Sequence, residues 1–213
     1  MYLRVEDIRK EFKRLYAEGV FNARGMLDIQ GSSFIADEPS IFGVPNQEYI
    51  DKELAWYLLQ SRNVYDMPNP PKIWKDIATP DGYVNSNYGY LVFGKDNNNQ
   101  FQKVVRTLRR RIDSKQATMI YTRPSMHQDS FADGRKDFVC TNTVNYNQDL
   151  IDHKRLNCIV NMRSNDAVYG YKNDLPWQQY VLQRVCDEVD MVPGIIYWQT
   201  SSLHIYPRHF PLL

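Results

Sequence analysis

The sequence has few cysteines, almost no net charge and no long apolar run, and each shortage excludes a class of protein. Its three cysteines, Cys140, Cys158 and Cys186, form no disulfide framework, and no zinc-binding spacing of Cys and His occurs. The net charge of +1 gives no reason to expect binding to nucleic acid or to an anionic membrane. No apolar run approaches the roughly 18 residues that a membrane span requires. We therefore expect a soluble cytoplasmic protein with reduced thiols, no metal, no membrane association and no direct DNA binding.

The composition of the chain is that of a globular domain. It is 43% hydrophobic and 24% charged, enough apolar content to bury a core, and we expect one domain spanning residues 1–213. Helical and alternating apolar patterns are mixed without strict strand–helix alternation, which favours the α+β class. The expected helices span 5–19, 47–62, 101–114 and 176–191, and the expected strands span 27–35, 118–123, 137–147, 156–164 and 194–206.

Glu53 lies in the helix expected over residues 47–62. The apolar spacing of this helix turns Tyr49, Leu54, Tyr57 and Leu58 toward the core. An exposed carboxylate is the commonest kind on such a helix. The pattern alone therefore assigns Glu53 no special role.

Cys140, in the segment DFVCTNTV, has two interpretations. A cysteine in a β-branched segment is most often an inert buried side chain. Arg163 and Ser164, however, offer a cation and a hydroxyl suited to a phosphate, and nearby cations favour the nucleophilic thiolate. Together these residues indicate a reactive thiol in a protein that binds a phosphorylated ligand.

Several segments, in order along the chain, resemble a known family: ADEPSIFG, ELAWY, PKIW, NSNYGY, MIYTRPSM, DFVCTNTV, NMRSNDAVYGYKND and SLHIYPRHF. The resemblance is to the deoxycytidylate hydroxymethylase branch, of the T-even phage type, within the thymidylate synthase superfamily. It implies a large twisted mixed β-sheet with flanking helices, paired sheet to sheet in a homodimer. It also implies dCMP and 5,10-methylenetetrahydrofolate as substrates, an infected bacterial host as location, and other phage nucleotide-synthesis enzymes as further partners.

The resemblance implies a role for each matching residue. Cys140 would add to C6 of the pyrimidine and make C5 nucleophilic, Glu53 would organise water and proton transfer, and Tyr88 would assist proton removal at C5. The remaining matches bind substrate or folate: Arg163 and Ser164 at the phosphate, His204 and Tyr206 at the sugar 3′-hydroxyl, Asn165 at the nucleotide, and Trp74, Asp166 and Gly170 at the folate.

Asp174 stands where thymidylate-making members carry Asn, and this exchange changes the hydrogen bonds offered to the base. Uracil presents an acceptor oxygen at position 4 and a donor N–H at position 3, whereas cytosine presents an amine donor and an unprotonated ring nitrogen. A carboxyl group accepts from the amine and shares a proton with the ring nitrogen, so Asp174 favours cytosine. Asp174 is also two residues before Pro176, a spacing typical of a helix start, so a capping role is a second interpretation.

Three departures from the family pattern concern the phosphate and the folate. The two arginines that precede the MIYTR strand, supplied to the partner subunit, are replaced by Lys115 and Gln116, and the run 109–111 (Arg-Arg-Arg) lies nearby. The N-terminal phosphate loop of the family carries Lys or Arg before Thr-Gly, and here we expect Arg24 to take the place of that cation. The chain ends at Leu213, where relatives continue into a tail that helps to close over the folate, so we expect that tail to be missing.

Other functions fit parts of the same pattern. A methyl product would require hydride in place of water at C5, and a ribonucleotide would give a CMP hydroxymethylase. A weakened nucleotide-binding or regulatory homologue is the non-enzymatic alternative, motivated by the lost arginine and the short end. The retention of Cys140, Glu53, Asp174 and Arg163 together argues for the enzyme.

Overall fold

The computed structural model describes residues 2–132 and 136–213. The chain forms two compact units, Met1–Pro45 with Val144–Leu213 and Asn46–Thr143, and each is described by itself. The prediction of one domain over the whole chain stays a prediction. None of the helices in the described ranges is both long and apolar enough to cross a membrane.

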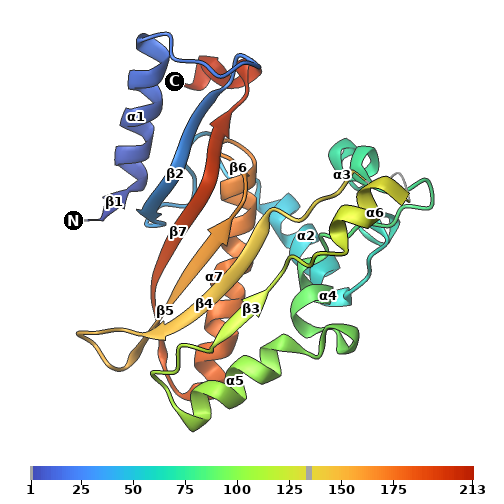
Figure 1. Ribbon diagram of the computed structural model, residues 1–213, viewed down its shortest axis with the longest axis vertical. Coiled ribbons are helices and arrows are strands. Elements are labelled where there is room, and N and C mark those ends of the chain that lie inside the picture. Colours follow the sequence, from blue (N-terminus) through green and yellow to red (C-terminus); the bar gives the residue numbers. More distant parts are fainter. Residues whose placement is uncertain (1, 133–135) are drawn as a thin grey trace. The chain divides into compact units, whose positions relative to one another are not determined.

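The first unit is built on a mixed β-sheet (Figure 1), which confirms the predicted α+β class. Its strands run in the order β1-β2-β7-β5-β4, and β6 pairs with β7. β2 and β7 are antiparallel, whereas β7 is parallel to β5 and β6. The strands span Leu3–Arg4 (β1), Leu27–Ile35 (β2), Thr141–Gln148 (β4, whose first three residues belong to the second unit), Arg155–Met162 (β5), Asn165–Asp166 (β6) and Val192–Ile205 (β7).

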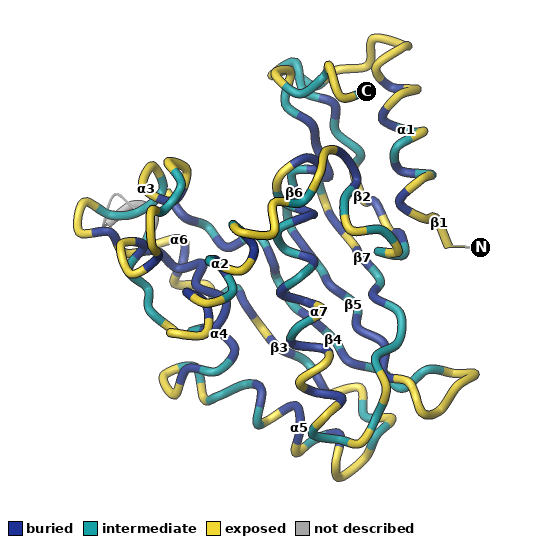
Figure 2. The backbone as a smooth tube through the Cα atoms, turned by 180° about the vertical axis from the view of Figure 1, so that it is seen from behind, coloured by how far each residue is buried: buried dark blue, intermediate teal, exposed yellow. Residues whose placement is uncertain are grey.

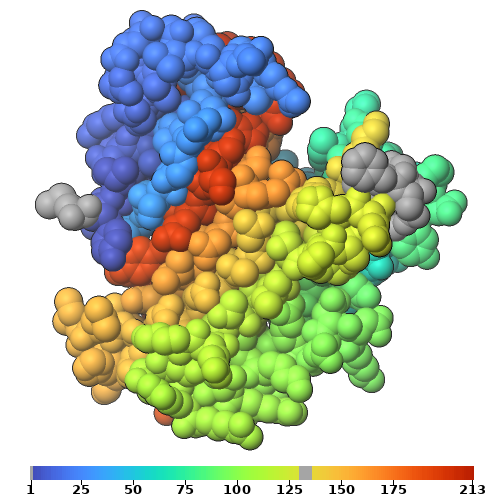
Figure 3. Space-filling model, viewed as in Figure 1, coloured from blue at the N-terminus to red at the C-terminus, as the bar shows by residue number. Residues whose placement is uncertain are grey.

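One face of this sheet is buried by helix α7 (Gly170–Val189), which lies behind β5 and β7 in Figure 1 and in front of them in Figure 2. Phe34 and Trp198 face each other across β2 and β7, and the ring of Tyr171 on α7 lies 5.8 Å and 5.1 Å from theirs. The alternate residues point to the other face, where Ile35 and Tyr197 are half-buried. Figure 3 shows strands β2, β7 and β5 at the surface on that side.

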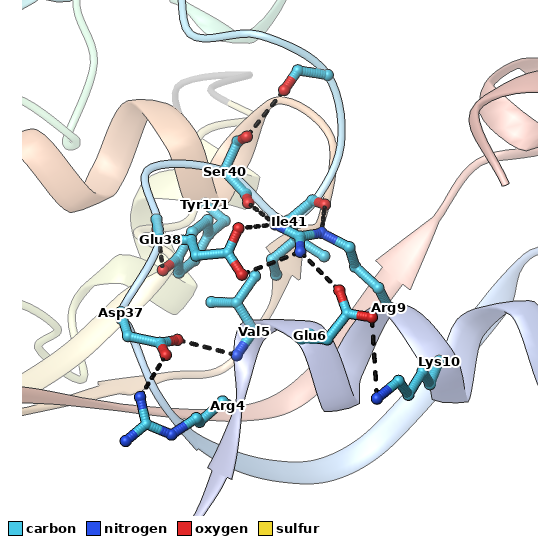
Figure 4. A network of polar contacts seen from close by, with 11 residues as sticks. Arg4, Val5, Glu6, Arg9, Lys10, Asp37, Glu38, Ser40, Ile41 and Tyr171 are labelled. Atoms are coloured by element: carbon cyan, nitrogen blue, oxygen red, sulfur yellow. Dashed lines mark hydrogen bonds and ion pairs between the residues drawn. The ribbon is translucent and has the colours of Figure 1, made fainter.

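Helix α1 (Val5–Ala17) lies beside β2, in agreement with the helix predicted over 5–19. It buries Val5, Ile8, Phe12 and Leu15, which recur at helical spacing. A polar network fixes the loop after β2 to this helix (Figure 4): Arg9 donates to the carbonyls of Ile41 at 2.7 Å and Ser40 at 3.0 Å, and it also pairs with Glu38. The Tyr171 hydroxyl donates to the Glu38 carbonyl at 2.8 Å, so the same loop is tied to α7.

The second unit is mainly helical. Glycine is required where α2 meets α4, because a Cβ at Gly89 would lie 1.7 Å from the Tyr57 carbonyl oxygen. The N–H of Tyr121, just after β3, donates to the Asn142 carbonyl at 2.9 Å. The elements are α2 (Gln47–Leu59), α3 (Lys72–Ile77), α4 (Tyr88–Phe93), α5 (Gln100–Arg110), β3 (Thr118–Ile120) and α6 (Met126–Ala132), with single 3₁₀ turns at Val64–Asp66 and Lys95–Asn97.

Two predictions about helices were wrong in ways that bear on function. Helix α7 begins at Gly170 rather than near Pro176, so Asp174 lies inside the helix and does not cap it. Asp166 supports the helix entry instead, since its Oδ1 accepts from the N–H groups of Val168 at 2.8 Å and Tyr169 at 3.3 Å. Helix α2 buries Ile50, Glu53, Trp56 and Tyr57, while Leu58, predicted to face the core, is 43% exposed.

Candidate active site

The residues predicted to form the site fall into two groups, one in each unit. The first unit holds Arg24, Arg163, Ser164, Asn165, Asp166, Gly170, Asp174, His204 and Tyr206. The second holds Glu53, Trp74, Tyr88, Lys115 and Cys140.

Asp174 is held by Asn165. The Asn165 Nδ2 donates to Asp174 Oδ2 at 2.8 Å, and Asn165 itself is only 3% exposed. A Cβ at Gly170 would lie 2.7 Å from that same Nδ2, so a side chain there would displace Asn165. Gly170, predicted to bind folate, therefore has a clear structural role as the space that Asn165 occupies. The result is a carboxylate on the first turns of α7 with one oxygen fixed by a donor.

Strand β6 brings the 163–166 segment beside the predicted sugar-binding residues. Asp166 pairs with His204 in the parallel register of β6 and β7, and the Ala167 N–H donates to the His204 carbonyl at 2.9 Å. His204 is 7% exposed, and its ring meets that of Tyr206 at 5.0 Å and 89°. The predicted pair is thus a contacting pair, and it lies against the segment that carries Asp166.

The cations predicted to bind phosphate are partly or fully exposed. Arg163 and Ser164 form the two-residue link between β5 and β6 and are half-buried. Arg24 is exposed in a turn where its N–H and that of Met26 both donate to the Asn22 side chain, at 2.9 Å and 3.1 Å. Lys115 is exposed in the turn after α5. Such positions suit cations that meet a soluble anion.

Glu53 is buried, contrary to the common exposed position of helix glutamates. It is 6% exposed, and the hydroxyl of Tyr49, one turn earlier, donates to its Oε1. Trp74 in turn donates its indole N–H to that hydroxyl at 3.0 Å, so Trp74, Tyr49 and Glu53 form one chain of hydrogen bonds. A buried carboxylate within such a chain is typical of a group that handles protons. Sequence reasoning missed Tyr49, although its spacing of four residues from Glu53 indicated the contact.

Tyr88 lies beside the residue that follows Cys140. Its hydroxyl accepts from Thr141 Oγ1 at 3.1 Å, and its ring stacks on Tyr57 at 5.3 Å. Asp137, also missed, binds the segment before Tyr88: its Oδ2 accepts from the N–H groups of Asn85 at 2.6 Å and Ser86 at 2.7 Å. The strand predicted over 137–147 begins only at Thr141, so residues 137–140 lie outside β4, and Asp137 contacts the segment before the Tyr88 helix.

Cys140 differs from the other two cysteines in accessibility. None of the three forms a disulfide, but Cys158 and Cys186 are fully buried while Cys140 is half-buried. Desolvation raises the pKa of the Cys186 thiol to about 12, and raises that of Cys158 still further. Because the thiolate is the nucleophile, the greater exposure of Cys140 favours it over the other two cysteines as a reactive thiol.

Comparison with known proteins gives consistent results. A family model described as thymidylate synthase matches residues 46–213. The chain is 46% identical over 195 residues to a deoxycytidylate 5-hydroxymethyltransferase of Enterobacteria phage T4, covering 88% of this chain and 78% of that protein. It is 24% identical over 165 residues to a thymidylate synthase of Francisella tularensis subsp. holarctica, covering 74% and 60%. A thermostable thymidylate synthase A from Bacillus subtilis superposes with a TM-score of 0.70 at 16% identity, covering 97% and 81%, which shows the fold.

Proposed function

The chain belongs to the thymidylate synthase family, and from this premise we propose that it is a deoxycytidylate 5-hydroxymethyltransferase. It transfers the one-carbon unit of 5,10-methylenetetrahydrofolate to C5 of dCMP, and water completes the hydroxymethyl group. The single observation that carries the choice of base is the Asp174 carboxylate, oriented by Asn165 at 2.8 Å.

Base selection follows from the way Asn165 holds Asp174. With Oδ2 accepting from Asn165, the carboxylate offers acceptors and no donor to the base. The cytosine amine donates to it, and a proton taken up from water between the carboxylate and the ring nitrogen stabilises the charge that develops during attack. Uracil would bring its own carbonyl oxygen against this carboxylate. Sites with such reversed pairing discriminate by about 10⁴–10⁵.

The chemistry begins with the thiolate of Cys140. Addition of its sulfur to C6 makes C5 a nucleophilic enamine carbon, which forms a bond to the one-carbon unit. Loss of the C5 proton, assisted by Tyr88, and release of the folate leave an exocyclic methylene. Water ordered through Glu53 and Tyr49 adds to this methylene as Cys140 leaves C6, which yields hydroxymethyl-dCMP.

The remaining predicted residues bind the two substrates. Arg163, Ser164 and Arg24 meet the phosphate, and His204 with Tyr206 meets the 3′-hydroxyl. Asp166 and Trp74 serve the folate. The indole N–H of Trp74 already donates to Tyr49, so the indole offers the folate an apolar surface. These assignments come from the family and from the groups that each side chain presents.

We also propose that two copies pair through the sheet face opposite α7. That face carries half-buried residues such as Ile35, Ile159 and Tyr197. Such apolar and aromatic side chains suit a protein–protein interface better than a surface exposed to solvent. Lys115 would then serve the phosphate of the partner subunit. A monomeric mass by light scattering at micromolar concentration would contradict the pairing of two copies. It would leave the proposed reaction unaffected.

Tritium release from [5-³H]dCMP with methylenetetrahydrofolate tests the proposed function, with [5-³H]dUMP in parallel and the product mass recorded. We expect release from dCMP alone and a hydroxymethyl product. A methyl product would refute the water step and leave the base assignment intact, and parallel reactions with CMP decide the sugar. Absence of release from either deoxynucleotide would refute the enzymatic proposal and favour a nucleotide-binding homologue.

A further inference from the structure

Lys172, in the first turn of α7, is a buried lysine that the mechanism above does not use. The residue is only 7% exposed, yet within residues 2–132 and 136–213 no hydrogen bond or ion pair involves its ammonium. Its Nζ lies 4.9 Å from the centre of the Tyr169 ring. Its Nζ is not among the fully enclosed side-chain polar atoms without a partner in the described residues.

The loop after β2 is shaped around this ammonium. A Cβ at Gly43 would lie 3.2 Å from Lys172 Nζ, and Gly43 has a φ of +73°, so both space and backbone favour glycine there. The Arg9 network anchors the preceding part of the same loop (Figure 4). A lysine that merely packs its stem and extends its head into water needs no such fixed surroundings.

Asp166 supplies the complementary charge nearby. Its Oδ1 is occupied by the N–H groups of Val168 and Tyr169, whereas its Oδ2 has no hydrogen-bond partner among the described residues. Asp166 raises the pKa of Lys172 electrostatically, against the larger lowering caused by burial, but the two side chains form no ion pair. Both side chains contact Tyr169, since Asp166 accepts from its backbone N–H and the Lys172 ammonium lies over its ring, so an acceptor and a donor are present at this residue.

The aromatic groups around this pair suit a flat ligand. The Tyr169 side chain is 51% exposed, and the His209 ring meets it edge-on at 5.0 Å. A planar heterocycle that carries an N–H beside a carbonyl would satisfy both charges at once, since the N–H donates to a carboxylate while the carbonyl accepts from an ammonium. The 4-oxo pterin ring of a folate has this edge.

We propose that Lys172 donates a hydrogen bond to the 4-oxo group of the folate pterin, beside the ring N–H that meets Asp166, the residue already assigned to the folate above. Lys172 is thus a specificity residue for the co-substrate, an assignment that rests on the proposed function. In a 4-amino pterin the oxygen is replaced by an amine, so the Lys172 ammonium would face a donor. The site therefore selects 4-oxo over 4-amino folates.

The test compares binding of folic acid and its 4-amino analogue to the whole protein saturated with dCMP, by calorimetry. We expect the wild type to prefer folic acid and Lys172→Met to reduce that preference about 10-fold or more, as expected for loss of a charge-assisted hydrogen bond. Lys172→Arg, which keeps the charge, retains part of the preference. Exposed Lys154→Met is the matched control and leaves the preference and the dCMP affinity unchanged.

Three results would overturn the proposal. An unchanged preference in folded Lys172→Met would show that the ammonium does not meet position 4. A loss of affinity that grows with the number of glutamates on the folate would assign the ammonium to the tail carboxylates instead. A wild type that binds dCMP and releases tritium, but binds both ring types equally, refutes Lys172 selection alone, whereas a wild type with neither tritium release nor folate binding refutes the proposed function as well.

Discussion

Replacing Asp174 with asparagine should convert the enzyme from dCMP to dUMP. The substitution keeps the shape of the side chain, and the new amide oxygen can still accept from Asn165 Nδ2, as Oδ2 does at 2.8 Å. The amide NH₂ must then point where the second carboxylate oxygen was. Asn165 thus sets the orientation of the amide, and that orientation presents a donor to position 4 of the base.

The size of the change follows from the hydrogen bonds exchanged. With dCMP the variant loses a charge-assisted hydrogen bond of about 1.5–3 kcal/mol and opposes the cytosine amine with a donor, which costs about 1–3 kcal/mol more. The sum corresponds to a fall in kcat/KM for dCMP of roughly 10²–10⁴. With dUMP the same donor meets the position-4 oxygen, so kcat/KM for dUMP rises. The ratio of kcat/KM for dCMP to that for dUMP therefore falls by more than kcat/KM for dCMP does.

Tritium release from both nucleotides, measured as kcat/KM, is the assay for Asp174→Asn. The matched control is Asp187→Asn on the same helix, where an exposed carboxylate accepts from Gln183 at 2.7 Å and no change of base preference is expected. An equal loss for dCMP and dUMP in a folded Asp174→Asn protein would mean that Asp174 does not read the base. The account of its orientation by Asn165 would then be wrong as well.

Three further predictions use other parts of the chain. Cys140→Ala abolishes tritium release, whereas Cys186→Ala, in the core, keeps release and lowers stability by roughly 1 kcal/mol; release by Cys140→Ala would exclude covalent addition. Tyr49→Phe removes a donor from Glu53 and lowers kcat about 10-fold at unchanged KM for dCMP, while exposed Tyr65→Phe has no effect; a KM change alone would contradict a role in water ordering. Hydrogen bonds from Asn157 and two backbone N–H groups lower the pKa of Asp149 from 3.8 to about 2, so its stabilisation is present above pH 4 and is lost as the pH falls toward 2. Asp149→Asn should therefore lower Tm at pH 6 and converge with wild type near pH 2, and a constant difference in Tm would refute the linkage.

Local patterns predicted the elements whose contacts are regular. The apolar spacing of α1 and the alternation of β2 gave their positions to within two residues, because each has one uniformly buried face. The two-residue strand β6 is too short to show an alternating apolar pattern. It is a strand because it pairs with β7. Helix α7 starts six residues before the predicted start, because the Asp166 side chain supports its entry and the helix tolerates Pro176 at its seventh position.

Site chemistry was predictable only where the family resemblance supplied it. Glu53 is joined through Tyr49 to Trp74, which is 21 positions away along the chain. No periodic pattern reports a contact of that kind, because it is set by the packing of α3 against α2 rather than by either helix alone. For the same reason the spacing of α2 suggested Leu58 for the core and left Glu53 at the surface.

Several residues that depart from ordinary sequence rules are those to which we assign functional roles. Glu53 and Lys172 are ionisable groups in buried positions, and Asp174 is an acidic residue two positions before a proline inside a helix. Each arrangement carries a cost in folding free energy, since burial disfavours charge and proline cannot donate to the Lys172 carbonyl one turn earlier.

Burial lowers the pKa of Lys172, so its ammonium reduces stability at neutral pH, and this penalty declines as the pH rises through that lowered pKa. Lys172→Met should therefore raise Tm at pH 7 while it weakens pterin selection, and this opposition separates a ligand-binding lysine from one that stabilises the fold. A fall in Tm together with unchanged selection would identify Lys172 as a structural residue.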